Sequence, residues 1–159
     1  GINTEFNITP SPYLSIKSGL TFQTSRYEKP HEFNEHRFFR TPGQYGYITL
    51  DMTPTKRLSI TSTGNYTGRM LIPYFGNTLD RPDEGELRLS PRFFDMGIKA
   101  SYDVRLNGST VQVFVGAKNL LNSYQKDFDQ GADRDPGYIY GPGSPRSIYF
   151  GLKIGNLLR

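Results

Sequence analysis

Four aspartates lie close together in the last third of the sequence, and this is the residue pattern that most suggests metal chemistry. They are Asp127, Asp129, Asp133 and Asp135, within DFDQGADRDPG. Oxygen ligands clustered with glycine suit Ca²⁺, which takes about 6 to 8 oxygen atoms. An EF-hand would need a glutamate where this chain has Tyr138. The pattern therefore leaves two interpretations open: a calcium site outside the EF-hand class, or a charged surface loop whose carboxylates pair with nearby cations at little net gain.

The two histidines of the chain, His31 and His36, are the next candidates, and both lie in one polar stretch. They are either haem or metal ligands or simply solvated loop residues. The chain contains no cysteine, and neither histidine has a serine and an acid nearby in a nucleophile context, so we predict that it is not an enzyme. Three further candidate ligand-binding residues lie in other polar stretches, namely Arg81, Tyr138 and Tyr140.

Composition excludes several classes of protein. The 159 residues are 35% hydrophobic, and no run approaches the roughly 18 apolar residues that a membrane-spanning helix needs. Disorder is disfavoured because 14% of the residues are aromatic. A net charge of +4, dispersed along the chain, is too small to predict a nucleic-acid partner. The first ten residues lack the pattern of a signal peptide, so we expect either a protein that is not exported or a mature or partial chain.

The elements that must position these residues are predicted by a hydrophobic period of two, which is typical of strands. Seven segments alternate in this way, and no segment predicts a helix; they are residues 2–8, 14–22, 48–52, 58–66, 94–104, 111–117 and 148–154. The alternation places a set of apolar residues on one common face, comprising Leu14, Ile16, Leu20, Ile48, Leu50, Ile98, Val113, Ile148 and Leu152. The sequence therefore predicts an all-β fold.

The connections between the predicted strands alternate between short and long. Short turns are expected at residues 10–12, at residues 54–56 and at Asn107-Gly108, a pair that strongly predicts a hairpin. Long polar loops are expected over residues 28–43, 73–91 and 121–145. All long loops would then lie at one end of an antiparallel up-and-down sheet. Outer-membrane β-barrels have this layout, with an apolar outer face and a polar lumen.

A soluble sandwich also alternates apolar and polar residues, so the period alone does not separate it from a membrane barrel. The predicted strands are about 10 to 14 residues long, which suits tilted strands that span a bilayer. Seven alternating strands would leave the first and last parallel, and an open sheet edge is not tolerated in lipid. We therefore expect a transmembrane β-barrel segment, with further strands before Gly1.

More specific motifs lie between residues 115 and 155. A strand ends in an Asn-Leu-Leu-Asn turn, a long loop rich in Tyr, Asp and Gly follows, and a Pro-Arg pair opens the final strand. The matching residues are Val115, Asn119, Leu120, Leu121, Asn122, Tyr124, Pro145, Arg146 and Gly151. This stretch resembles the end of TonB-dependent outer-membrane receptors, especially those of Bacteroidetes.

The resemblance implies that residues 1–159 are the C-terminal part of a barrel of about 22 strands, without the plug domain. It implies an importer of a siderophore, haem, cobalamin or an oligosaccharide in the outer membrane of a Gram-negative bacterium. The implied partners are the lipid bilayer, the plug and remaining strands, the TonB complex through the missing N-terminal part, and a surface lipoprotein. The alternatives are a passive porin or adhesin barrel and a soluble β-sandwich binding module.

Overall fold

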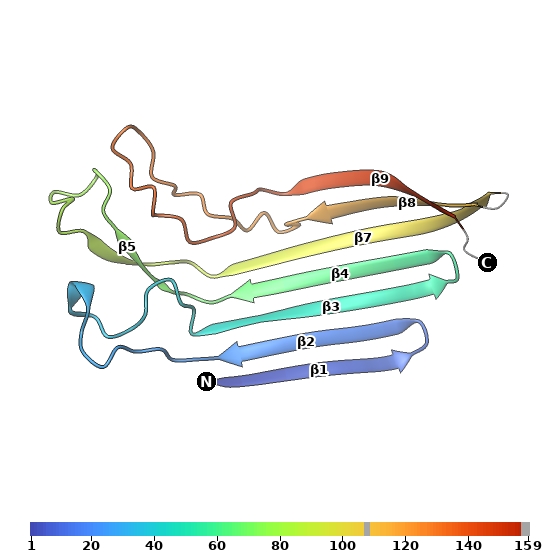
Figure 1. Ribbon diagram of the computed structural model, residues 1–159, viewed down its shortest axis with the longest axis horizontal. Helices are drawn as coiled ribbons and strands as arrows, with labels where there is room; N and C mark the ends of the chain where they lie inside the picture. Colours follow the sequence, from blue (N-terminus) through green and yellow to red (C-terminus); the bar gives the residue numbers. More distant parts are fainter. Residues whose placement is uncertain (107–108, 157–159) are drawn as a thin grey trace.

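The computed structural model describes residues 1–106 and 109–156, and its main feature is one seven-stranded antiparallel sheet (Figure 1). The strands pair in the order β1-β2-β3-β4-β7-β8-β9. Their bounds are Ile2–Ser11, Leu14–Phe22, Gln44–Thr55, Leu58–Thr67, Phe93–Leu106, Ser109–Lys118 and Ser147–Asn156. The predicted all-β class and the sequential antiparallel pairing of the predicted strands are confirmed. The predicted Asn107-Gly108 turn lies outside the described residues.

A second, two-stranded sheet lies inside the second long loop, where the sequence predicted none. It consists of β5, Leu71–Tyr74, and β6, Glu86–Leu89, paired antiparallel. Strands this short give almost no periodic signal, and Pro73 inside β5 further weakens it. The helical structure among the described residues is a single 3₁₀ turn, η1, Glu32–Asn34, and no helix in this part of the chain has the length and apolar character to cross a membrane.

The predicted alternation of short and long connections is confirmed, with all long loops at one end of the sheet (Figure 1). The short turns lie slightly later than expected, at Pro12-Tyr13 and at Lys56-Arg57. Each strand continues through the first two predicted turn residues, with a bulge or irregularity that shifts the register between Ile8 and Ser11 and between Met52 and Thr55. Proline has no N–H to donate to a regular ladder, and it is tolerated at irregular positions because no donor is needed there.

Strand register divides the sheet into an apolar face and a polar face, because residues directly paired across strands lie on the same face. One such row crosses all seven strands and consists of Ile8, Ile16, Leu50, Ser62, Ile98, Ala117 and Ile148. The apolar set predicted from the sequence lies on this face. On the other face, hydrogen bonds join neighbouring strands: Thr61 donates to Asp51 at 2.8 Å, and Gln112 donates to Asp103 at 2.8 Å.

Neither face of the large sheet carries the hydrophobic core. Side chains of the apolar face are strongly exposed, with Ile148 at 76%, Ile98 at 41% and Ile48 at 39%. The buried hydrophobic side chains of the described residues instead lie in the long loops or at the strand end beside them, and they are Met70, Ile72, Tyr74, Phe93 and Tyr138. Folding of the described residues therefore leaves an extended apolar surface without a partner.

The described strands form an open sheet with two free edges. β1 and β9 each pair with a single neighbour. Because each strand is antiparallel to the next, β1 and β9 run in the same direction (Figure 1). Pairing them with each other would therefore create a parallel contact in an otherwise antiparallel sheet.

Candidate functional site: the loop layer

The three long loops gather at one end of the sheet and are called the loop layer here (Figure 1). The first comprises residues 23–43, the second residues 68–92 and the third residues 119–146. Arg40 joins all three: its backbone N–H donates to the Leu71 carbonyl at 2.8 Å, and its Nη2 donates to the Gly137 carbonyl at 2.6 Å. The loops therefore form one connected layer.

A small hydrophobic core holds the second and third loops together. Ile72 on β5 is fully buried, and the rings of Tyr74 and Tyr138 meet edge to face with centroids 4.6 Å apart. Leu79 and Tyr140 pack against this core. Burial of such side chains contributes about 1.5 to 3 kcal/mol each. The β5–β6 hairpin is therefore the base on which the third loop packs.

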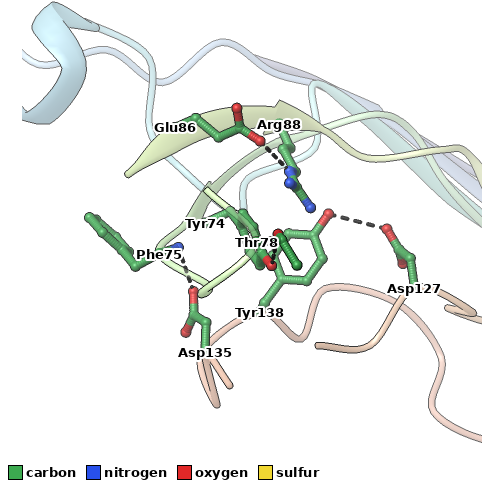
Figure 2. Close-up of polar contacts among 8 residues, drawn as sticks. All are labelled: Tyr74, Phe75, Thr78, Glu86, Arg88, Asp127, Asp135 and Tyr138. Atoms are coloured by element: carbon green, nitrogen blue, oxygen red, sulfur yellow. Dashed lines mark hydrogen bonds and ion pairs between the residues drawn. The ribbon is translucent and has the colours of Figure 1, made fainter. Parts of the chain in front are cut away.

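Arg88 on β6 covers the aromatic part of this core (Figure 2). Its guanidinium carbon lies 3.6 Å from the centroid of the Tyr74 ring and 5.4 Å from that of Tyr138. A cation over an aromatic face is attracted by the ring quadrupole. Its Nε also donates to Glu86 Oε1 at 2.6 Å. The charge of Arg88 is thus paired and turned toward the loop core.

Asp127 accepts hydrogen bonds from two tyrosine hydroxyls. Tyr138 donates to its Oδ2 at 3.1 Å (Figure 2), and Tyr140 donates to its Oδ1 at 2.5 Å. Burial raises the pKa of both phenols, and the neighbouring Asp127 carboxylate raises it further, whereas Arg88 opposes the rise at Tyr138. Both tyrosines therefore remain protonated donors at neutral pH.

Gln125 joins the two limbs of the third loop, and no sequence motif marked it. Its side chain is 1% exposed, and its Nε2 donates to the Tyr138 carbonyl at 2.9 Å. Its Oε1 accepts from the backbone N–H of Tyr140 at 2.9 Å and of Gly141 at 3.3 Å. Both polar atoms of this amide bind backbone that lies more than ten positions later in the chain, so the local sequence gives no sign of this role.

Two of the other aspartates in the predicted calcium set also accept hydrogen bonds from the backbone. Asp135 accepts from Phe75 N–H at 2.9 Å (Figure 2) and from Gly137 N–H at 2.8 Å. Asp129 accepts from Asp135 N–H at 2.7 Å, and Asp133 is exposed. Within residues 1–106 and 109–156, no group of three acidic or histidine side chains is arranged to hold a metal ion. Calcium binding by this loop stays a prediction.

The other predicted ligand-binding residues lie in the first and second loops, whereas Tyr138 and Tyr140 lie in the third. Both histidines are exposed in the first loop, where the His31 ring stacks on Tyr27 with centroids 5.1 Å apart. His36 Nδ1 lies 3.2 Å from the Tyr27 carbonyl oxygen. Arg81 is exposed in the second loop and pairs with Glu84 at 2.9 Å. Of this predicted set, the structure brings Tyr138 and Tyr140 together at Asp127 and both histidines together at Tyr27, and Tyr138 is buried.

The Asn-Leu-Leu-Asn motif caps the end of β8 and fixes the start of β9. Asn119 and Asn122 both adopt left-handed backbone, with φ of 49° and 53°. The buried Asn119 side chain donates to the Ser144 carbonyl and accepts from Ser123 N–H, both at 2.8 Å. Asn122 accepts from Arg146 N–H at 3.0 Å, directly after Pro145. Leu120 N–H donates to the Met96 carbonyl at 2.7 Å, which ties the turn to β7.

No family model matches the chain, and no curated protein matches it either. The resemblance to TonB-dependent receptors that the motif residues indicate stays a prediction.

Proposed function

We propose that this chain is the C-terminal part of the transmembrane β-barrel of a TonB-dependent receptor, which imports a nutrient across the outer membrane of a Gram-negative bacterium. In this proposal the apolar face of the sheet contacts lipid, the polar face lines the lumen, and the loop layer contributes to ligand capture outside the cell. Gating and energy coupling belong to a plug domain and a TonB contact elsewhere in the protein.

The observation that carries the proposal is the exposed apolar face. Monomeric soluble proteins rarely expose contiguous apolar patches of more than a few hundred Å². Here, apolar side chains on six of the seven strands are strongly exposed, among them Phe6 at 61%, Leu20 at 42% and Phe150 at 86%. A bilayer covers such a surface, whereas a soluble sandwich would need a second sheet over it. The one other sheet among the described residues is the β5–β6 hairpin in the loop layer.

The ends of the sheet support the same proposal. Outer-membrane barrels have tight turns at the periplasmic end and long loops at the extracellular end. The chain has two-residue turns at one end and loops that pack on each other at the other. The free edges of β1 and β9 could not lie in lipid with their N–H and C=O groups unpaired. In a barrel of about 22 strands, they pair with strands outside this chain.

The test is to replace residues 127–143 by a short Gly-Ser linker in the full receptor, and to measure ligand binding and uptake in cells with and without TonB. We expect weaker binding and uptake from the shortened loop, and no uptake by either protein without TonB. As a control for barrel integrity, the shortened receptor should still assemble in the outer membrane and resist protease added outside the cell. Uptake that survives loss of TonB would contradict an importer and favour a passive porin. The absence of a plug domain would do the same.

A further inference from the structure

A small pocket opens between the first and second loops of the loop layer, and neither Tyr138 nor Tyr140 lines it. Its volume is about 250 Å³. Three arginines line it: Arg26 and Arg37 come from the first loop, and Arg69 comes from the second. Hydroxyl side chains of Thr24, Ser25 and Thr41 also line it. We call this the arginine pocket.

The arginine pocket carries an excess of positive charge. No carboxylate of the described residues lines it. Arg37 pairs with Glu35 at 2.7 Å, and this ion pair lowers the pKa of Glu35 to about 2. Within residues 1–106 and 109–156, neither Arg26 nor Arg69 is in an ion pair. Like charges held around one cavity repel each other, and an anion between them removes that repulsion.

A neighbouring cavity extends the positive region. It measures about 170 Å³ and is lined by Arg69 and Arg92 together with Gln44 and Tyr66. Arg69 therefore lines both cavities, and Arg92 adds a further arginine to the second. Guanidinium groups present planar pairs of N–H donors that match carboxylate and phosphate oxygens, and they are favoured where such groups are recognised.

We infer that the arginine pocket binds an oxyanion group, a phosphate, sulfate or carboxylate, carried by a small solute. Arg26 and Arg69 supply net positive charge and paired N–H donors, Arg37 adds N–H donors beside its ion pair with Glu35, and the hydroxyl groups of Thr24 and Ser25 supply further donors. The inference rests on the proposed function, because only that function places the pocket at the cell exterior. It adds that the nutrient of the importer is anionic.

The test uses the full-length receptor purified in detergent and calorimetric titration with inorganic phosphate, inorganic sulfate and citrate at low ionic strength. We expect saturable binding of at least one of these anions, and weaker binding as salt screens the charges. Combining Arg26→Gln with Arg69→Gln should weaken that binding by tenfold or more, since each charge-assisted hydrogen bond contributes about tenfold. Arg26 and Arg69 are exposed, so the double variant should keep its melting temperature.

The matched control combines Lys56→Gln with Arg57→Gln, which removes the same two positive charges at the exposed turn between β3 and β4, at the opposite end of the sheet. It should bind the anion as the unsubstituted receptor does. Saturable binding of none of the three anions, or equal binding by the double variant, would overturn the inference. Because this measurement needs neither TonB nor uptake, a receptor that binds an anion but fails the transport test contradicts the proposed function alone.

Discussion

Asn119 and Asn122 fix the backbone where β8 ends. Each adopts a positive φ, which asparagine tolerates better than most residues, and each uses its side chain to bind backbone that leads into β9. Two functions, conformation and hydrogen bonding, therefore combine in a single residue type.

Substitution of Asn119 separates these functions. Asn119→Gly keeps the left-handed backbone but leaves the Ser123 N–H and Ser144 carbonyl without their partner, so we expect the third loop to lose about 1 to 3 kcal/mol. Asn119→Ala adds backbone strain of about 1 kcal/mol or more. Hydrogen exchange of the third loop measures both changes. Equal protection in Asn119→Ala and the unsubstituted protein would contradict this role.

The phenols of Tyr138 and Tyr140 predict a pH dependence. Their pKa values are raised above the ordinary 10.0, so the stability that the protonated phenols contribute is complete below pH 10.0 and is lost as pH rises through the folded-state values. Absorbance at 295 nm should show both groups ionising later than ordinary tyrosines. Replacing both by phenylalanine should remove this late phase, whereas Tyr13→Phe, at a residue 62% exposed, should leave it. A late phase unchanged in the double variant would show that other tyrosines produce it.

Sequence reasoning at the residue scale succeeded where chemistry and neighbours are local. The Asn-Leu-Leu-Asn motif was visible because its residues are adjacent, and Tyr138 and Tyr140 lie two positions apart on one stretch. The role of Gln125 could not be predicted because its nearest hydrogen-bond partner, Tyr138, is distant in the sequence. The arginine pocket could not be predicted because Arg69 comes near Arg26 and Arg37 only when the loops fold.

At the scale of elements, the β5–β6 hairpin and the third loop act as one packed unit. The unit has its own buried core and its own hydrogen bonds, including that from the Phe75 N–H to the Asp135 carboxylate. It adjoins a sheet whose strands have regular ladders of their own. Loss of packing in the unit should therefore loosen the loops before it loosens the sheet.

Ile72→Ala tests this separation. Ile72 is 0% exposed, so its truncation should destabilise the loop layer by about 2 to 5 kcal/mol. Leu89→Ala, at a residue 54% exposed on the paired strand, should change stability by no more than about 0.5 kcal/mol. Hydrogen exchange resolved by segment compares the loops with the sheet. Deprotection of β3 and β4 equal to that of the loops would mean that the two parts unfold together.

The strands of the large sheet were predictable because 9 to 14 residues of alternating pattern leave a clear signal. The two short strands were not predictable, since four residues fit either period and β5 contains a proline. The short turns were predicted too early because Pro10 and Pro54 each favour a turn when the local sequence is considered alone. In the structure, an irregular register lets the strand continue past each proline.

At the scale of the whole molecule, the two faces of the sheet should respond differently to charge. Ile148 lies on the apolar face and Ser147 on the polar face, next to each other on β9. In the full receptor, Ile148→Arg should cost about 2 to 4 kcal/mol if the position lies near mid-membrane, and less toward the interface. Ser147→Arg should cost much less. Denaturant unfolding from lipid vesicles measures both, and equal costs would argue against contact with lipid.

The central claim is that the apolar face of the sheet lies against lipid. The most direct measurement places a nitroxide label at Ile98→Cys and, in a second protein, at Lys99→Cys, in the full receptor reconstituted into vesicles with any native cysteines removed. Relaxation by oxygen, which concentrates in lipid, is compared with relaxation by a water-soluble nickel complex. We predict that oxygen relaxes the label at position 98 more strongly and nickel the label at position 99. Strong relaxation by nickel at position 98, or the same response at both positions, would contradict the membrane barrel.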